Sequence, residues 1–186
     1  MTRRTPHAAL FLDRDGVINV ERNYVHRIED FEFVEGIFDL CRAAADRQMP
    51  IVVITNQAGI GRGYYSEEQF HTLTRWMREQ FVAQRAPLSA VYFCPFHPEY
   101  GVGEYRKESF ERKPNPGMIL RARDELSLDL TRSVLVGDKG SDVQAGKSAG
   151  IGTTVLLGED VESSLPTRSV CRLADVIPLL SLVESC

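Results

Sequence analysis

Short apolar runs alternate with amphipathic stretches along most of the chain. Five of the runs have the length of buried strands and end at polar or glycine-containing turns, namely 8–12, 51–54, 90–93, 133–136 and 153–157. Segments with apolar residues at helical spacing lie between them, at 36–47, 66–85 and 142–149. Strands that alternate with helices in this way predict a doubly wound, mostly parallel α/β sheet of the Rossmann type.

Local signals mark several helix ends. Ser66 followed by Gln69 is typical of a capping box, which would begin the second of these helices. Pro116 is predicted at the first position of a further helix, where its missing N–H costs nothing, and Gly150 is predicted to cap the last helix. The apolar faces of the first two helices are predicted to pack in the core, and they comprise Ile37, Leu40, Cys41, Ala44, Phe70, Leu73, Met77 and Phe81.

Polar side chains follow three of the predicted strands. Asp13 and Asp15 come directly after the first strand, Thr55 after the second and Asp138 after the fourth. Because the carboxyl ends of parallel strands share one edge of a sheet, where ligands bind, we expect these residues to lie together. Two carboxylates at one strand end repel each other unless a cation lies between them, which favours a divalent metal such as Mg²⁺. The alternative for Asp13 and Asp15 is a solvated turn or a helix cap.

Two cations and a second acidic segment complete the candidate chemistry. Lys113 follows Arg112 directly before a predicted helix, and its ammonium group can neutralise charge on a transferring phosphoryl group. At the fourth strand end, Asp138 is predicted as a metal ligand and Asp142 as a cap of the helix that follows. Thr55 and the glycine-rich turn after it can donate hydrogen bonds to a phosphate, although an ordinary strand-to-helix turn is the alternative there.

The composition is that of an ordinary globular protein. The 186 residues are 43% hydrophobic and 26% charged, with a formal net charge of -4 and a pI near 5.6. A single domain over 1–186 is therefore predicted. The acidic balance argues against a general nucleic-acid-binding protein, but it allows a local basic pocket for a small phosphorylated partner.

The cysteines and the apolar runs predict a cytoplasmic protein. The cysteines, at positions 41, 94, 171 and 186, show neither a CxxC pair nor dense spacing, so we expect free thiols in a reducing compartment. No signal-peptide core precedes Asp13, and no apolar run approaches the length of a membrane span. Residues 1–7 are predicted to form a mobile tail.

Four ordered motifs resemble those of the haloacid dehalogenase-like phosphohydrolases. They are Asp13-Arg14-Asp15-Gly16, Thr55-Asn56, Lys113-Pro114 and Gly137-Asp138-Lys139-Gly140-Ser141-Asp142. From about Ala8 to Leu157 the chain also resembles one branch of that family, the D-glycero-D-manno-heptose 1,7-bisphosphate 7-phosphatases, and next best the histidinol-phosphate phosphatases. The segments that point to the first branch are 15–19, 24–25, 55–63 and 112–118.

The resemblance implies a mechanism with defined roles. Asp13 would attack phosphorus to form an aspartyl-phosphate, while Asp15 would protonate the leaving sugar oxygen and later activate water. Mg²⁺ would be held by the Asp13 carboxylate, the Asp15 backbone carbonyl and Asp138. Thr55 and Lys113 would stabilise the transferring phosphoryl group.

The resemblance also implies which residues contact the substrate. In that branch, contacts to the sugar or its phosphates come from the positions that match Glu21, Arg22, Asn23, Tyr24, Thr55, Asn56, Gln57, Ala58, Arg112 and Lys139. Arg112 is predicted to clamp the distal phosphate of a bisphosphate. The intervals between the motifs leave no room for an inserted cap domain, so substrate choice is expected to come from loops around an open site.

One departure from that branch concerns zinc. Many of its members bind structural zinc through a Cys-x-His pair and a later Cys-x-Cys, whereas this chain has Cys94-Pro95-Phe96-His97 and then Ser109-Phe110-Glu111. Because only Cys94 matches a ligand position and serine is a poor zinc ligand, we expect no bound zinc. The loop at 94–114 is instead expected to be held by the packing of Phe93, Phe96, Tyr100, Tyr105 and Phe110.

These inferences favour a monomeric, cytoplasmic, Mg²⁺-dependent phosphatase. Its predicted reaction removes the 7-phosphate of heptose 1,7-bisphosphate, on the route to nucleotide-activated heptose for lipopolysaccharide. The alternative among enzymes is a histidinol-phosphate or other small sugar-phosphate phosphatase. The alternative of another class is a non-catalytic phosphate-binding module, although a mere binding protein would have no chemical use for Asp15.

Overall fold

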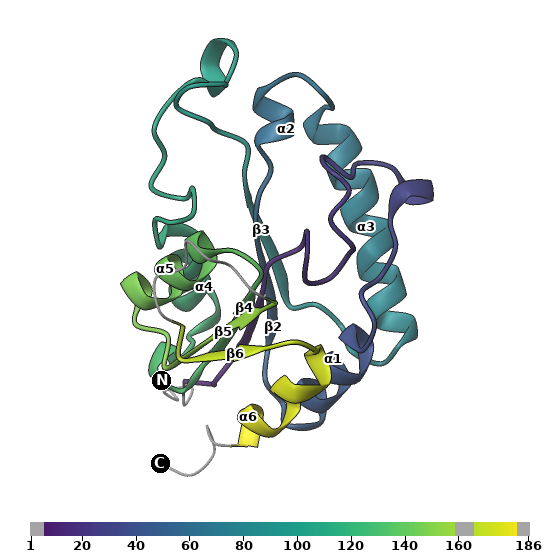
Figure 1. Ribbon diagram of the computed structural model, residues 1–186, viewed down its shortest axis with the longest axis vertical. Coiled ribbons are helices and arrows are strands. Elements are labelled where there is room, and N and C mark those ends of the chain that lie inside the picture. Colours follow the sequence, from purple (N-terminus) through teal and green to yellow (C-terminus); the bar gives the residue numbers. More distant parts are fainter. Residues whose placement is uncertain (1–5, 159–165, 182–186) are drawn as a thin grey trace, which may run out of the picture.

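A six-stranded sheet lies at the centre of the computed structural model, which describes residues 6–158 and 166–181 (Figure 1). Its strand order is β3-β2-β1-β4-β5-β6, and every neighbouring pair is parallel. The strands are β1 (Leu10–Leu12), β2 (Ile51–Asn56), β3 (Ala90–Cys94), β4 (Val134–Gly137), β5 (Thr153–Leu157) and β6 (Arg168–Val170). The predicted parallel sheet and its first five strands are confirmed, whereas β6 was not predicted.

Helices cover both faces of the sheet, as expected for a doubly wound fold. They are α1 (Ile37–Asp46), α2 (Ala58–Gly61), α3 (Glu67–Ala83), α4 (Gly117–Leu126), α5 (Gly140–Ala149) and α6 (Ile177–Ser181). Helices α4 and α5 pack on one face, and α1, α3 and α6 on the other (Figure 1). Side chains of β1 alternate between the two cores: Leu10 and Leu12 face α1 and α3, while Phe11 faces α4.

The helix ends follow the local signals with two corrections. Ser66 and Gln69 form both hydrogen bonds of a capping box, and Gly150 caps α5 with a left-handed backbone. Pro116, however, is the N-cap of α4 and not its first helical residue. Helix α5 begins two positions before the predicted Asp142, because that side chain reaches back to accept a hydrogen bond from the Lys139 N–H at 3.1 Å.

The order of the strands reverses beside β1. From β1 the chain adds β2 and β3 on one side, while β4, β5 and β6 extend the sheet on the other side. In open α/β sheets such a reversal leaves a crevice at the carboxyl ends of the two central strands, where ligands bind. Asp13 follows β1 and Asp138 follows β4, and the Asp13 N–H donates to the Val136 carbonyl at 3.0 Å.

The loop at 94–114 packs on the segment that contains α2. The Val102 N–H donates to the Gly61 carbonyl at 2.8 Å, and the Tyr105 hydroxyl donates to Glu67 at 3.0 Å. The prediction that its aromatic residues are packed is wrong for Tyr100 and Phe110, which are 56% and 63% exposed.

The remaining expectations concern the chain ends and membranes. The predicted tail lies outside the described residues at 1–5, whereas His7 pairs with Leu128 in an isolated bridge. Among the helices of the described residues, none is long and apolar enough to cross a membrane.

Candidate active site

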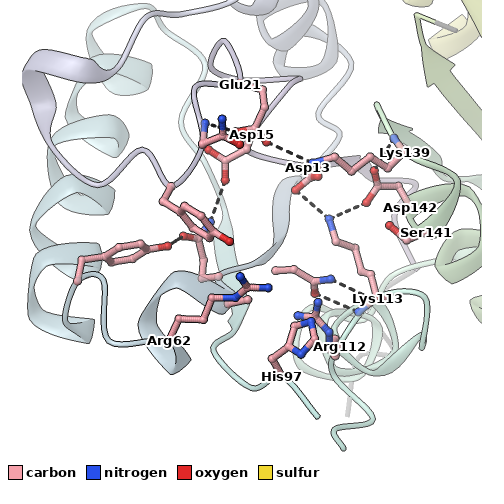
Figure 2. Close-up of a pocket in the computed structure, with 16 residues that line it drawn as sticks. Asp13, Asp15, Glu21, Arg62, His97, Arg112, Lys113, Lys139, Ser141 and Asp142 are labelled. Carbon is pink, nitrogen blue, oxygen red and sulfur yellow. Dashed lines mark hydrogen bonds and ion pairs between the residues drawn. The ribbon is translucent and has the colours of Figure 1, made fainter. Parts of the chain in front are cut away.

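A cavity of about 390 Å³ opens at the carboxyl edge of the sheet (Figure 2). Eleven of the predicted site residues line it: Asp13, Asp15, Glu21, Asn23, Tyr24, Asn56, Gln57, Ala58, Arg112, Lys113 and Lys139. The cavity is also lined by five residues that the prediction of the site did not include, Arg62, Tyr65, His97, Ser141 and Asp142. Most of the residues predicted for the site therefore line one cavity.

Asp13 and Lys113 form a buried ion pair at the floor of the cavity. Lys113 Nζ lies 2.8 Å from Asp13 Oδ1 and 2.6 Å from Asp142 Oδ1, and it donates to the Ile54 carbonyl at 3.1 Å. Although burial lowers the pKa of Lys113, its two carboxylate partners raise it well above its usual range. Burial, opposed by Lys113, raises the pKa of Asp13 to about 7. Lys113 is therefore a fixed cation. The raised pKa of Asp13 shows that its negative charge is not fully offset by Lys113, so a further cation can bind next to it.

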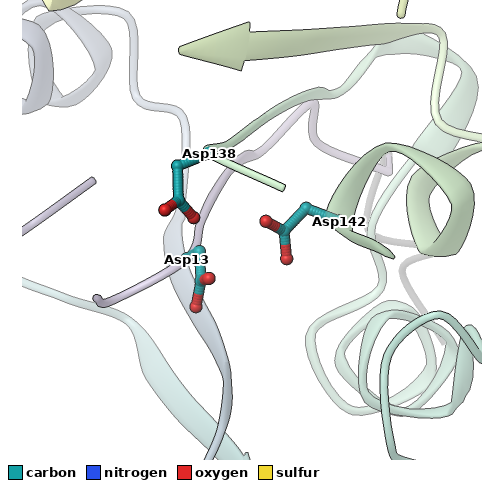
Figure 3. A group of neighbouring side chains, drawn as sticks. All are labelled: Asp13, Asp138 and Asp142. Atoms are coloured by element: carbon teal, nitrogen blue, oxygen red, sulfur yellow. The ribbon is translucent and has the colours of Figure 1, made fainter. Parts of the chain in front are cut away.

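Three carboxylates converge beside this pair (Figure 3). One oxygen each of Asp13, Asp138 and Asp142 lies within 4.8 Å of the others. Asp138 is close because residue 16 is glycine: a Cβ there would lie 2.1 Å from Asp138 Oδ2, and its φ of +89° also favours glycine. Asp138 Oδ1 is buried without a hydrogen-bond partner in the described structure, and burial raises the pKa of Asp138 to about 6.

These features fit a hard divalent cation. Mg²⁺ binds oxygen ligands and is commonly held by one or two carboxylates, with water and phosphate oxygens in its other positions. The unpartnered Asp138 oxygen and the Asp13 carboxylate are suitable donors, whereas Asp142 is already bonded to Lys113 and to the Lys139 N–H. Asp13, Asp142 and Lys113 line the cavity, whereas Asp138 does not line it but lies beside Asp13 and Asp142. These four residues, here called the acidic end, can thus hold Mg²⁺ next to a phosphoryl group.

Asp15 is held at the wall of the cavity by three side chains. Its Oδ1 accepts from Arg14 Nη2 at 2.7 Å and from Asn19 Nδ2 at 3.1 Å, while its Oδ2 accepts from Gln57 Nε2 at 3.0 Å. Arg14 is itself 1% exposed and donates to the Val25 carbonyl. The carboxyl group that is predicted to act as acid and base therefore has a fixed orientation.

Thr55, Asn56 and Gln57, at the end of β2, form hydrogen bonds that hold Asp15 and Lys113 in place. Gln57 Nε2 donates to Thr55 Oγ1 at 2.8 Å as well as to Asp15, so the Thr55 hydroxyl proton is free to point elsewhere. The Asn56 amide bonds both the N–H and the carbonyl of Lys113. Thr55 is 1% exposed and lies beneath the cavity lining, while Asn56 positions Lys113.

Two arginines and a histidine lie across the cavity from the carboxylates. Arg62, His97 and Arg112 form this cationic end (Figure 2). Arg112 Nη1 donates to the Phe96 carbonyl at 3.1 Å, and burial lowers the pKa of Arg112. Burial and the two guanidinium groups also lower the pKa of His97, which favours its neutral form. This end is suited to an anion.

Of the predicted substrate-binding residues at the rim, most line the cavity, but Arg22 does not. Glu21 accepts from Lys139 Nζ at 3.2 Å and from the Asn23 N–H at 2.9 Å, so both neighbours are oriented by it. Tyr24 is 38% exposed and packs edge-on against Tyr64. Arg22 does not line the cavity; it is exposed and pairs with Glu32.

The position that could hold zinc has a different chemistry here. Cys94 is buried, burial raises the pKa of its thiol, and Ser109 is within hydrogen-bond reach of it. In the part of the chain that the structure describes, Cys94 belongs to no group of three metal-ligating side chains. Phe96 is covered instead by Lys107, whose Nζ lies 4.0 Å from the ring centre. These residues do not fit a tetrahedral zinc site.

Comparisons with known proteins relate the chain to named phosphatases. A family model described as HAD-hydrolase-like matches residues 110–179. The D-glycero-alpha-D-manno-heptose-1,7-bisphosphate 7-phosphatase of Burkholderia mallei is 54% identical over 176 residues, which cover 93% of either chain. The D-glycero-beta-D-manno-heptose-1,7-bisphosphate 7-phosphatase of Vibrio cholerae is 48% identical over 149 residues, or 80% of either chain.

A solved structure supports the same fold. The D,D-heptose 1,7-bisphosphate phosphatase from B. bronchiseptica, in complex with magnesium and phosphate, superposes with a TM-score of 0.81 at 24% identity. The match covers 94% of this chain and 98% of that chain.

Proposed function

The chain belongs to the family of D-glycero-manno-heptose-1,7-bisphosphate 7-phosphatases, HAD-like enzymes that hydrolyse phosphoric monoesters, and on that premise we propose that it removes the 7-phosphate of the heptose bisphosphate. The observation that carries the proposal is a single cavity with two unlike ends. Asp13, Lys113 and Asp138 lie together at one end, and Arg62, His97 and Arg112 line the other. A substrate with two phosphates can be bound at both ends at once.

In the first step, Asp13 attacks the phosphorus of the 7-phosphate. The bond from phosphorus to the sugar oxygen breaks, and Asp15 gives its proton to that leaving oxygen. Lys113 and the Thr55 hydroxyl stabilise the charge on the phosphoryl oxygens. Gln57 donates hydrogen bonds to both Asp15 and Thr55, so the distance between the proton donor and the hydroxyl that binds the phosphoryl group is fixed.

In the second step, water releases the phosphate from Asp13. Asp15, now without its proton, accepts a proton from the attacking water, and the acyl-phosphate bond breaks to restore the Asp13 carboxylate. When Mg²⁺ is bound by Asp13, the Asp15 carbonyl and Asp138, it lowers the repulsion between carboxylate and phosphate. Lys113 offsets part of the negative charge of the buried carboxyl groups of Asp13 and Asp142, and a bound divalent cation would offset more of it.

The surroundings of the cavity support a small substrate and an open site. Between β1 and β2 the described chain has only the loop before α1 and α1 itself, so we propose a single domain without a cap. Arg112 binds the distal phosphate, and Glu21, Asn23, Tyr24 and Lys139 surround the sugar. We also propose that the protein works as a monomer in the cytoplasm, without zinc; the thiols of Cys41, Cys94 and Cys171 are free.

The test of this proposal is a comparison of substrates in the presence of Mg²⁺. We would measure kcat/KM for both anomers of heptose 1,7-bisphosphate, for histidinol phosphate and for simple hexose phosphates, and locate the released phosphate by phosphorus NMR. The expected result is a preference for one heptose bisphosphate of about 100-fold or more, which corresponds to about 2.7 kcal/mol of transition-state binding.

Three other results would contradict the proposal in different ways. Comparable rates on all substrates would indicate a small sugar-phosphate phosphatase, and a preference for histidinol phosphate would select that alternative. Phosphate binding without turnover on any substrate would indicate the non-catalytic binding module.

A further inference from the structure

Arg62 has no role in the two reaction steps above, and its side chain lines the cationic end of the cavity. It follows α2 directly, and it is half-buried. Its guanidinium lies 4.4 Å from the centre of the Tyr100 ring and 5.8 Å from that of Tyr24. The two rings come from separate loops, so the position of Arg62 depends on how these loops pack together.

The charge of Arg62 has no acidic partner within the described residues. No carboxylate of those residues forms an ion pair with it, and its Nε is buried without a hydrogen-bond partner. Its charged neighbour is another cation, since Arg62 helps to lower the pKa of Arg112 and of His97. Two half-buried guanidinium groups that line the same cavity repel each other, and an anion bound between them would relieve this repulsion.

We propose that Arg62 and Arg112 together bind the phosphate that is not transferred, with Tyr24 and Tyr100 holding the Arg62 guanidinium in place. This inference rests on the proposed function, because it requires a substrate with two phosphates. The planar guanidinium group donates two parallel hydrogen bonds to phosphate oxygens, and a phosphate dianion balances the charge of two arginines.

The packing of the two loops brings these arginines together. A Cβ at residue 61 would lie 2.4 Å from the Pro95 carbonyl oxygen, so only glycine allows the turn after α2 to approach the loop at 94–114 this closely. The hydrogen bond from the Val102 N–H to the Gly61 carbonyl fixes the approach at 2.8 Å. A phosphate bound by Arg62 and Arg112 therefore bridges both loops.

Because of its contacts with the two rings, Arg62 is better suited to bind an anion than an ordinary surface arginine. Aromatic rings restrict the guanidinium without neutralising its charge, which lowers the entropic cost of binding an anion. His97 adds a defined neighbour: its Nδ1 accepts from the N–H groups of Glu99 and Tyr100 at 3.2 Å, so the neutral ring carries its proton on Nε2.

The experiment compares Arg62→Met with the unchanged enzyme on two substrates, heptose 1,7-bisphosphate and heptose 7-phosphate, with Mg²⁺ present. Methionine keeps the apolar stem between the rings but removes the charge. We expect KM for the bisphosphate to rise about 10- to 100-fold, because a hydrogen-bonded charge is lost, with kcat nearly unchanged. The kcat/KM for the monophosphate should stay the same, which also shows that the variant is folded.

Two further variants complete the design. Arg106 is exposed, lies on the loop at 94–114 that also carries Arg112, and does not line the cavity. Arg106→Met therefore removes one positive charge and should change neither the KM for the bisphosphate nor that for the monophosphate. Arg62→Lys keeps the charge but not the planar group, so it should recover part of the lost affinity.

The outcomes separate this inference from the function on which it rests. If the unchanged enzyme prefers the bisphosphate and Arg62→Met keeps that preference, or loses activity equally on both substrates, binding of the distal phosphate by Arg62 is wrong and the proposed function stands. If the unchanged enzyme does not prefer the bisphosphate, both proposals are wrong.

Discussion

The two ends of the cavity carry opposite charges and are built in opposite ways. At the acidic end, Asp13 and Asp142 lie within 2.8 Å and 2.6 Å of the same buried Lys113 ammonium group. At the cationic end, Arg62 contacts aromatic rings and Arg112 a backbone carbonyl. Within the described residues, neither arginine has a carboxylate partner. The acidic end thus carries part of its counter-charge within the protein, as Lys113, whereas the cationic end has no acidic counter-charge among the described residues and would be balanced by an anionic ligand.

This difference corresponds to two separate tasks in catalysis, stabilisation of the transition state and recognition of the rest of the substrate. Groups that stabilise a transition state must be oriented in advance, and regular secondary structure provides that order at the ends of β1, β2 and β4. Groups that recognise the remote part of a substrate can lie on loops, which differ more readily between relatives. The comparison therefore predicts that changes at the acidic end affect kcat and folding, while changes at the cationic end affect KM.

The largest effect is expected from Asp13→Asn. Asparagine cannot form the acyl-phosphate, so kcat should fall by at least about 10⁴-fold. Phosphate release under saturating substrate measures the loss, and beryllium fluoride should form an acyl-phosphate mimic on the unchanged protein but not on the variant. Asp46→Asn, at an exposed position far along α1, is the matched control and should be fully active. Full activity of Asp13→Asn would contradict the covalent mechanism.

Lys113→Met should have the next largest effect, and on stability as well as activity. It leaves the carboxylates of Asp13 and Asp142 buried without their cation, which should cost about 3–5 kcal/mol of unfolding free energy. Denaturant unfolding without Mg²⁺ measures this loss. The double variant with Asp13→Asn should recover part of it, because one unpaired carboxylate is removed. A loss below about 1 kcal/mol would show that the pair is not a structural requirement.

The three carboxylates of the acidic end could be predicted from sequence because each lies at the end of a strand or in the first turn of a helix, whereas Lys113 lies on a loop and was predicted from the basic pair before α4. An apolar run ends where a buried strand ends, so the positions of Asp13 and Asp138 followed from the pattern alone. The start of α4 differs by one position: the pattern predicts Pro116 as the first helical residue, where proline is common, whereas the structure has it as the N-cap. The three-residue β6 has too little apolar pattern to be recognised.

The cationic end could not be predicted in the same way. Arg62 lies in a glycine-rich stretch that was read as a loop, since glycine disfavours helices, yet α2 forms there because Gly59 and Gly61 fit against Tyr65 and Pro95. Contacts between two loops place Arg62, and no periodicity encodes them. An arginine between two glycines in a phosphate-binding turn was the available signal.

The pH dependence of Mg²⁺ binding gives a smaller and graded effect at the acidic end. Burial raises the pKa of Asp13 to about 7 and of Asp138 to about 6, from 3.8. Without a divalent ion, the folded state then binds more protons than the unfolded state between about pH 4 and 7. Its stability should therefore fall as pH rises through this range, by up to about 1.4 kcal/mol per pH unit for each carboxyl group.

Mg²⁺ competes with those protons, so its stabilising effect should have the opposite dependence. The gain in melting temperature at a fixed Mg²⁺ concentration should be small near pH 5 and reach its full size above about pH 7. Thermal unfolding with and without Mg²⁺ over this range measures it, and Asp13→Asn should reduce the dependence. An equal gain at all pH values would mean that these carboxyl groups do not hold the ion.

The smallest effect is expected at the cationic end, from removal of one ring. Tyr100→Ala takes away the ring whose centre lies 4.4 Å from the Arg62 guanidinium. A contact of this kind at an exposed site is worth about 0.5–1 kcal/mol, so KM for the bisphosphate should rise about two- to fivefold with kcat unchanged. Tyr100→Phe keeps the ring and should behave as the unchanged enzyme. If both variants were equally impaired, the hydroxyl group and not the ring would matter; if neither were, the distal phosphate alone would orient Arg62. The monophosphate should not distinguish the two variants, because the ring acts on substrate only through Arg62.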